Sequence, residues 1–271
     1  MSFPYKTALV LGATSGIGLE LANRLVSRGV YTIAVGRRQE RLDAFVKQHG
    51  PSKAAGYAFD IEKFDTAGPF AATVTKNHPD LDCIFLNAGV QHVMHIGKPE
   101  TISIAKIQQE INVNYIGMIA VTNAFLPFFQ KKPTGSESAF IYTTTSLETI
   151  PYPMVFSYSA SKAALRSYIL SAREMIKEVG GPKINLVELY TPVVQTELHD
   201  HQPGWGPGRE TGMPCSDFVT AAMKGFEAKD ETVIVGDPQK AMWDEFEAKR
   251  NERTAPFWAM VKKFNPGVHE L

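Results

Sequence analysis

The sequence has few cysteines and no excess of charge of either sign, and these shortages exclude several classes of protein. Lysine and arginine together number 28, and aspartate and glutamate also number 28, so no global field favours nucleic acid or an anionic membrane. The two cysteines, Cys83 and Cys215, lie far apart without the spacing of a metal site, and the seven histidines show no ligand spacing either. We therefore expect no metal, no nucleic-acid partner and a reducing compartment.

We also expect no segment that directs the chain into or across a membrane. Met1 leads almost directly into an apolar strand-like run, without the basic and apolar regions of a signal peptide. No window is expected to reach membrane-spanning length. These absences predict a cytoplasmic protein with no membrane partner, and its neutral balance of charge suits small-molecule partners.

What is present is a regular alternation of strand-like and helix-like segments over 271 residues. Strands separated by helix-length connections are expected to pair in parallel with right-handed crossovers. The sequence thus predicts an α/β fold: a single domain over 1–271 with a doubly wound parallel sheet and helices on both faces. The predicted strands are 7–11, 31–35, 55–59, 83–86, 139–144, 184–189 and 232–235, and the predicted helices are 16–28, 38–49, 65–77, 102–130 and 156–179.

Two segments depart from this alternation. Residues 197–216 are rich in Gly, Pro and His without clear periodicity, which is typical of a surface loop and predicts a substrate loop. The tail after Gly236 carries several aromatic residues, so we expect it to be helical and to pack against the domain or a neighbouring molecule.

Three glycines, Gly12, Gly16 and Gly18, follow the first predicted strand and open the first helix. Glycine permits a tight turn and a close approach of the backbone to a pyrophosphate, which then lies at the positive end of the helix. The pattern indicates a nucleotide site, although a glycine turn can also be a simple strand exit.

Tyr158 and Lys162 lie one helical turn apart and share a helix face. A fixed positive charge near a phenol favours the phenolate and lowers its pKa from about 10. The pair therefore predicts a general acid or base, although the same spacing occurs by chance on solvated helices.

Taken in order with Asp60-Ile61, Asn87-Ala88-Gly89 and Asn114, these motifs resemble the short-chain dehydrogenase/reductase family from about residue 7 to residue 198. The resemblance implies a Rossmann-type fold, a nicotinamide dinucleotide and hydride transfer to or from a carbonyl or alcohol. It assigns Asn114 to a helix kink that holds a water in a proton relay to the lysine. It also implies the cofactor contacts Gly12, Ser15, Gly16, Ile17, Gly18, Asp60, Ile61, Asn87, Ala88, Gly89, Tyr158, Lys162, Val194 and Thr196. Read alone, Asp60 could be a helix N-cap, residues 87–89 an ordinary turn, and Asn114 a polar residue facing water.

The catalytic hydroxyl has two candidates. Counting back from Tyr158 without gaps places Thr145 where the family has serine, whereas Ser146 fits if the intervening loop is one residue shorter. Either hydroxyl can donate a hydrogen bond to a substrate oxygen.

The cofactor choice depends on Arg37 and Arg38 at the end of the second strand, where an acidic residue would bind a ribose 2′-hydroxyl and a guanidinium suits a 2′-phosphate. NADP(H) is therefore favoured, and NAD(H) is not excluded. The segment 191–196, which contains Val194 and Thr196, resembles the family's stretch near the nicotinamide, but Thr191 and Pro192 replace its proline and glycine.

These features predict an NADP(H)-dependent oxidoreductase of the carbonyl reductase or alcohol dehydrogenase type, with Tyr158 as general acid or base and a small carbonyl or alcohol as substrate. Two alternatives remain: a non-catalytic NADP(H)-binding regulator, and an epimerase or dehydratase on the same scaffold. By the same resemblance, the helices 102–130 and 156–179 could pair across a two-fold axis in a homodimer or homotetramer.

Overall fold

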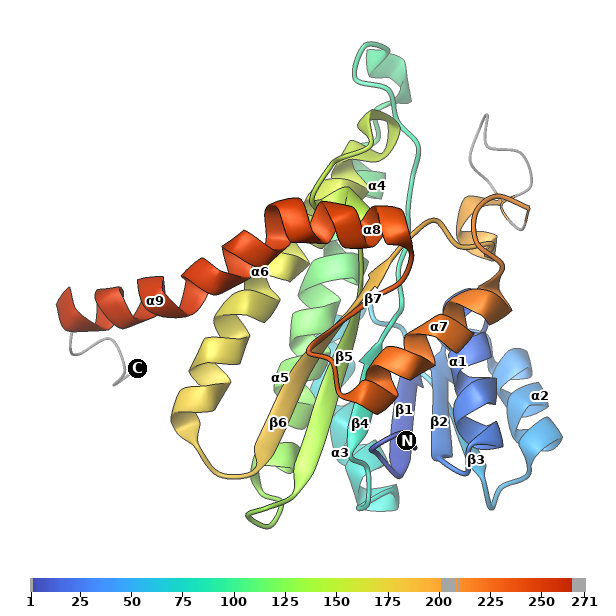
Figure 1. Ribbon diagram of the computed structural model, residues 1–271. Helices are drawn as coiled ribbons and strands as arrows, with labels where there is room; N and C mark the ends of the chain where they lie inside the picture. The colour runs from blue at the N-terminus through green and yellow to red at the C-terminus, as the bar shows by residue number, and fades with distance from the viewer. Residues whose placement is uncertain (1, 201–207, 209, 265–271) are drawn as a thin grey trace.

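The computed structural model describes residues 2–200, 208 and 210–264, and its described part contains one seven-stranded parallel sheet with helices on both faces (Figure 1). The strand order is β3-β2-β1-β4-β5-β6-β7. The strands are β1 Thr7–Leu11, β2 Tyr31–Gly36, β3 Ala54–Ala58, β4 Cys83–Leu86, β5 Glu137–Thr145, β6 Lys183–Thr191 and β7 Thr232–Ile234. The predicted doubly wound α/β fold is confirmed.

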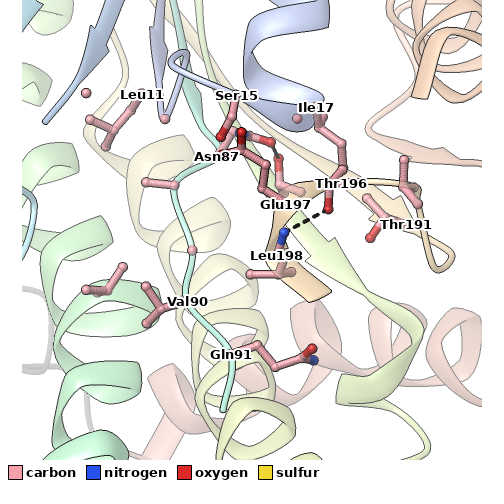
Figure 2. Close-up of a pocket in the computed structure, with 18 of the residues that line it drawn as sticks. Leu11, Ser15, Ile17, Asn87, Val90, Gln91, Thr191, Thr196, Glu197 and Leu198 are labelled. Atoms are coloured by element: carbon pink, nitrogen blue, oxygen red, sulfur yellow. Dashed lines mark hydrogen bonds between the residues drawn. The ribbon is translucent and has the colours of Figure 1, made fainter. Parts of the chain in front are cut away.

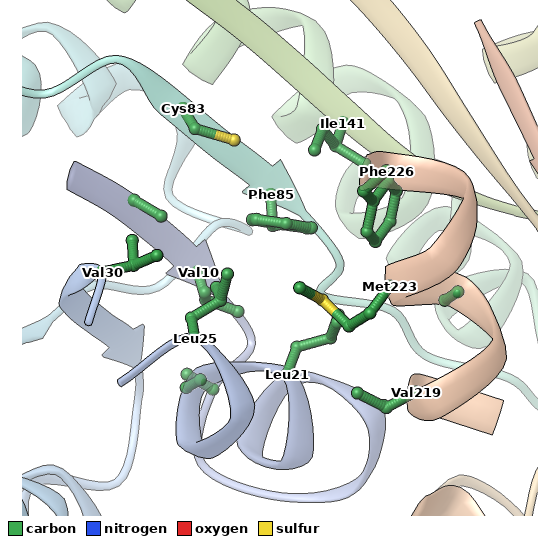
Figure 3. Packing of buried hydrophobic residues seen from close by; sticks show 14 of the residues in the cluster. Val10, Leu21, Leu25, Val30, Cys83, Phe85, Ile141, Val219, Met223 and Phe226 are labelled. Carbon is green, nitrogen blue, oxygen red and sulfur yellow. The ribbon is translucent and has the colours of Figure 1, made fainter. Parts of the chain in front are cut away.

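The helices form one layer on each face of the sheet. On one face lie α1 Gly16–Ser27, α2 Gln39–His49 and α7 Cys215–Ala228, and on the other lie α3 Ala67–Asn77, α5 Gly117–Gln130 and α6 Phe156–Val179. Figure 3 shows α1 and α7 packing through Leu21, Leu25 and Met223 onto Val10 of β1 and Phe85 of β4. The helix α7 was not among the predicted elements, although its apolar residues recur with helical spacing: Phe218, Val219, Ala222, Met223 and Phe226.

The order of the strands places a crevice beside β1. This strand pairs with β2 on one side and β4 on the other, so the chain winds outward in both directions from it. In a doubly wound sheet, ligands bind outside the carboxyl ends of the strands at this switch point. Leu11 and Leu86, the last residues of β1 and β4, are paired in register and mark that end of the sheet.

A continuous helical stretch runs over Ile104–Gln130, within the predicted helix 102–130, and it is interrupted at Asn114, where the resemblance implied a kink. It consists of α4 Ile104–Ile111, a π-helical segment Asn112–Ile116 and α5. By length and composition alone the stretch could cross a membrane, contrary to the expectation that no window reaches that length. Its buried apolar residues, among them Phe125 and Phe129, belong to the core cluster between the helices and the sheet.

The C-terminal segment lies along α6 (Figure 1). It comprises α8 Asp237–Met242, a π-helical segment Trp243–Glu247 and α9 Ala248–Phe264. The Trp243 ring packs 5.1 Å from the ring of Tyr190 on β6, and Trp258 donates a hydrogen bond of 2.8 Å to Glu178 on α6. Short 3₁₀ turns complete the described chain: Phe64–Thr66, Pro99–Thr101, Ser146–Glu148, Pro153–Val155 and Glu197–His199.

Candidate active site

A cleft of about 460 Å³ opens at the carboxyl ends of the strands, where the switch point predicts it (Figure 2). Arg37 and Arg38 line it after β2, and Tyr158 and Lys162 line it from α6. The other predicted site residues along its wall are Gly12, Ser15, Gly16, Ile17, Asp60, Ile61, Asn87, Ala88, Gly89, Thr145, Val194 and Thr196. Three predicted residues do not line the cleft: Gly18, Asn114 and Ser146.

The glycine turn is shaped by close packing of the backbone. Gly12 has a φ of +85°, and a Cβ atom there would lie 2.8 Å from the Cα of Ala88. A Cβ atom on Gly18 would overlap the carbonyl oxygen of Gly12. Only glycine fits both positions, and the turn thereby brings the N-terminus of α1 to the edge of the cleft. Gly18 therefore shapes the turn from behind without lining the cleft.

Tyr158 and Lys162 share one face of α6, as their spacing predicts. Their exposed fractions are 8% and 2%. The Lys162 ammonium donates a hydrogen bond of 2.9 Å to the Thr143 carbonyl and lies 5.7 Å from the centre of the Tyr158 ring. Lys162 is thus held at the end of β5, whose residues Thr143 and Thr145 also line the cleft.

The expected lowering of the Tyr158 pKa is not found. Burial raises the pKa of the phenol, and the carboxylates Glu148 and Glu110 raise it further. Burial also lowers the pKa of Lys162 to about 8, although the charge of Glu148 opposes that shift. Desolvation of the phenol therefore outweighs the attraction of the Lys162 charge that the sequence-based expectation invoked.

The two candidate hydroxyls differ in position. The side chain of Thr145 lines the cleft and accepts a hydrogen bond of 3.4 Å from the backbone N–H of Leu147. Ser146 begins the 3₁₀ turn Ser146–Glu148 and does not line the cleft. The geometry therefore favours Thr145 over Ser146 as the hydroxyl facing a substrate.

Asn114 lies in the π-helical segment between α4 and α5 and is fully buried. Its amide accepts a hydrogen bond of 2.9 Å from the Val90 N–H and donates one of 2.9 Å to the Val90 carbonyl. It also donates to the Ser161 hydroxyl on α6 at 3.1 Å. Asn114 thus ties the strand-end segment Asn87–Val90 to the helix that carries Tyr158 and Lys162.

The Asp60 carboxylate, which lines the cleft, accepts a hydrogen bond of 3.2 Å from the Glu62 N–H, as in an ordinary turn. Ile61 is buried beside Gly117 and presents an apolar surface to the cleft. Asn87 accepts a hydrogen bond of 3.0 Å from the Thr143 hydroxyl. Asp60, Ile61 and Asn87 all line the cleft.

Arg38 folds back over the glycine turn. Its guanidinium donates hydrogen bonds to the Thr14 hydroxyl at 2.8 and 3.1 Å and to the Ser15 hydroxyl at 2.7 Å. Its remaining nitrogen donates to the Glu197 carboxylate at 2.9 Å. Arg41 reaches the same carboxylate at 3.0 Å. Sequence reasoning missed Thr14, Arg41 and Glu197 as contributors to the site.

Thr196 caps the turn that carries Glu197, since its hydroxyl accepts a hydrogen bond of 3.4 Å from the Leu198 N–H (Figure 2). The neighbouring Val194 is buried and forms a parallel bridge with Met213. Much of the predicted substrate loop, residues 201–207 and 209, lies outside the described residues.

Sequence reasoning also missed a cluster of buried charges around Arg166 of α6. Arg166, two turns beyond Tyr158 on α6, is fully buried and pairs with Glu188 on β6 and with Glu247 at 3.3 Å. Glu148 lies 3.9 Å from the same guanidinium, and burial raises the pKa of its carboxyl. The carboxylates come from separate segments of the chain, so no local motif could reveal the cluster.

Comparison with known proteins identifies the family of the chain. A family model described as short chain dehydrogenase matches residues 6–205. The chain is 30% identical over 232 residues to a Bacillus subtilis (strain 168) protein named Uncharacterized oxidoreductase DltE, and the match covers 85% of this chain and 88% of that protein.

Solved structures share the fold. A short-chain dehydrogenase from Sphingobium yanoikuyae in complex with NADPH superposes with a TM-score of 0.78 at 20% identity, covering 92% of this chain and 95% of that chain. A short chain dehydrogenase/reductase from Burkholderia phymatum in complex with NAD has a TM-score of 0.73 at 18% identity, covering 86% of this chain and 90% of that chain.

Proposed function

The chain belongs to the short-chain dehydrogenase family, and from that premise we propose that it is an NADP(H)-dependent oxidoreductase acting on a carbonyl or alcohol of a small molecule, as a carbonyl reductase or alcohol dehydrogenase. The observation that carries the proposal is the convergence of the glycine turn with Tyr158 and Lys162 in one cleft. A buried phenol and ammonium at the carboxyl ends of a parallel sheet are placed for proton transfer beside a bound dinucleotide.

The residues of the cleft fit a dinucleotide phosphate. Gly12 and Gly18 leave no room for side chains, so the backbone of the turn and the N-terminus of α1 face the cleft and suit a pyrophosphate. Arg37 and Arg38 suit a 2′-phosphate, because a guanidinium offers a planar fork of donors to phosphate oxygens. We assign the adenine end of the cofactor to Asp60 and Ile61, and the nicotinamide end to Val194 and Thr196.

When bound, the nicotinamide supplies or accepts the hydride at the substrate carbon. In the reducing direction, Tyr158 donates its proton to the carbonyl oxygen, while the Thr145 hydroxyl holds that oxygen by a hydrogen bond. Lys162 stabilises the resulting phenolate, which regains a proton from solvent. Asn114 holds the cleft wall at Val90 and the helix at Ser161 in register, so that the phenol keeps its place.

Replacement of the phenol tests the proposal. A panel of carbonyl compounds is screened by the loss of reduced-cofactor absorbance with NADPH and with NADH, and Tyr158→Phe is then compared with the unmodified chain. We expect turnover to fall by roughly 10²–10⁴-fold, as for loss of a general acid, with little change in the Kd for NADPH.

Tyr168→Phe is the matched control, because it removes a phenolic hydroxyl from the same helix outside the cleft. Retained turnover in Tyr158→Phe would refute the assigned acid. NADPH binding without turnover of any compound by the unmodified chain would favour a regulator. Turnover without net consumption of NADPH would favour an epimerase or dehydratase.

Location and assembly remain part of the proposal. Cys83 and Cys215 are free thiols, consistent with a reducing cytoplasm. The exposed side chains of Met175 and Val179 give α6 an apolar surface that suits a homodimer or homotetramer. Size-exclusion chromatography with light scattering measures the assembly directly.

A further inference from the structure

Glu197 reaches across the mouth of the cleft to the arginines that follow β2. It is the first residue of the turn Glu197–His199 after β6, and Figure 2 shows its side chain extending toward Ser15 on the glycine turn. One carboxylate oxygen lies 2.9 Å from Arg38, and the other lies 3.0 Å from Arg41. The contact therefore joins segments 156 and more residues apart in sequence.

The backbone places Glu197 at this position. The preceding residues are fixed by pairing with Met213, because Gln195 donates a backbone hydrogen bond of 2.9 Å to Met213 and Met213 donates one of 2.9 Å to Val193. The hydroxyl of Thr196 then caps the turn. The carboxylate is thus presented to the arginines by the fold and does not depend on a long free segment.

The guanidinium of Arg38 has all three nitrogens engaged. Two donate to the hydroxyls of Thr14 and Ser15, which fixes the orientation of the fork against the glycine turn, and the third donates to Glu197. Partial burial raises the pKa of Glu197, but the hydrogen bonds from Arg38, Arg41 and Ser15 outweigh this and lower the pKa to about 2. The carboxylate is therefore charged at any working pH.

We propose that Glu197 reduces the preference for NADP(H) over NAD(H) by competing with the 2′-phosphate of NADP(H) for Arg38 and Arg41. The inference rests on the proposed function, which assigns Arg38 to the 2′-phosphate, and it adds Arg41, whose guanidinium shares the same carboxylate. The phosphate carries nearly two negative charges and three acceptor oxygens, so it displaces a single carboxylate but binds more weakly than it would to free arginines. NAD(H) has no group to compete at this point and leaves the contact intact.

The expected effect is moderate because the three side chains are partly exposed, by 26% for Glu197, 37% for Arg38 and 42% for Arg41. Ion pairs of this exposure are weakened by solvent and salt. Removing the carboxylate charge should therefore tighten NADPH binding by roughly three- to tenfold, and raised salt should reduce the gain.

The test compares the Kd values of NADPH and NADH for the full chain and for Glu197→Gln, by fluorescence or calorimetric titration. We expect the Kd of NADPH to fall by roughly three- to tenfold and that of NADH to change less than about twofold. Glu40→Gln is the matched control, because it removes one negative charge from the exposed surface of the helix that carries Arg41. Neither Kd should change in that variant.

Unchanged or weaker NADPH binding in Glu197→Gln would overturn the inference, and so would an equal gain for both dinucleotides, which would reflect a general change of charge. These outcomes leave the proposed function standing if the unmodified chain binds and oxidises NADPH. Failure of the unmodified chain to bind either dinucleotide would refute the proposed function itself, together with this inference.

Discussion

Replacing Arg166 with methionine should destabilise the protein strongly, although the residue lies outside the cleft. The guanidinium is fully buried, pairs with Glu188 and Glu247, bonds to Asn251 and lies 4.6 Å above the ring of Trp243. Methionine retains much of the volume but removes the charge. Loss of one partner from a buried ion cluster costs about 3–5 kcal/mol, because the remaining carboxylates stay buried without compensation.

This loss is large against a total stability of about 5–15 kcal/mol. For a chain of this size, it corresponds to a fall of roughly 6–20 °C in Tm, measured by differential scanning calorimetry or circular dichroism. Arg24→Met provides the control, since Arg24 forms a partly exposed ion pair with Glu20 one turn away on α1. That pair is worth about 0.5 kcal/mol, so the control should shift Tm by only a few degrees, about 2 °C.

The pH dependence of the deficit follows from Glu148. Burial raises the pKa of this carboxyl, and the charge of Arg166 lowers it in part. Without Arg166 that pKa rises further. A carboxyl whose folded pKa exceeds its unfolded value, about 4.3, binds more protons when folded, so the stability it contributes is lost as the pH rises above that value. The Glu148 carboxyl of the unmodified chain already has a pKa of about 8, so the two folded chains differ in bound protons mainly above that pH. The deficit of Arg166→Met should therefore be larger at about pH 9 than at about pH 7. A deficit under about 1 kcal/mol, or one independent of pH, would refute a charge-compensating role.

Three further predictions concern the cleft. Gly12→Ala should weaken NADPH binding by more than about tenfold in a titration, because its Cβ would overlap the neighbouring backbone. Gly29 has a similar positive φ of +80° but open space around it, so Gly29→Ala should lower stability without changing NADPH binding. The value of kcat/KM should fall as the pH rises through about 8, where Lys162 loses its proton, and a pH–rate profile without this limb would contradict a role for the ammonium. Thr145→Ala should lower turnover by at least about tenfold and Ser146→Ala should leave it nearly unchanged, so the reverse result in steady-state kinetics would exchange their roles.

Strand positions could be predicted where an apolar run in the sequence ends at a turn-forming residue. The strands β1 and β4 match the predicted residues because each run is bounded by a turn-forming residue, Gly12 or Asn87. The strand β5 begins two residues earlier than predicted, at Glu137. Its polar start did not resemble a strand, yet Glu137 pairs in register with Lys183 on β6 and forms an ion pair of 2.9 Å with it. Cross-strand pairing overrode the local polarity.

The candidate site likewise has a part that could be predicted from the sequence and a part that could not. Residues within short motifs, such as Tyr158 with Lys162, could be placed in the cleft because helical spacing fixes which side chains share a face. Contacts between segments that are distant in the sequence could not be predicted. The pairing of Arg38 with Glu197 and the approach of Glu148 to Arg166 depend on how β2, β6 and α6 pack together, and no periodicity in the sequence reports such contacts.

The protonation state of the cleft bears on the direction of the proposed reaction. Burial and two nearby carboxylates raise the pKa of Tyr158, so the phenol is protonated at neutral pH. Reduction of a carbonyl requires this form, since the oxygen must receive a proton as the carbon receives hydride. Oxidation of an alcohol requires the phenolate form of Tyr158. The Lys162 ammonium would offset the charge of that phenolate, but burial lowers the pKa of Lys162 to about 8. Reduction is therefore the direction for which the two groups already hold their proton, and oxidation has to pay the cost of ionising a desolvated phenol.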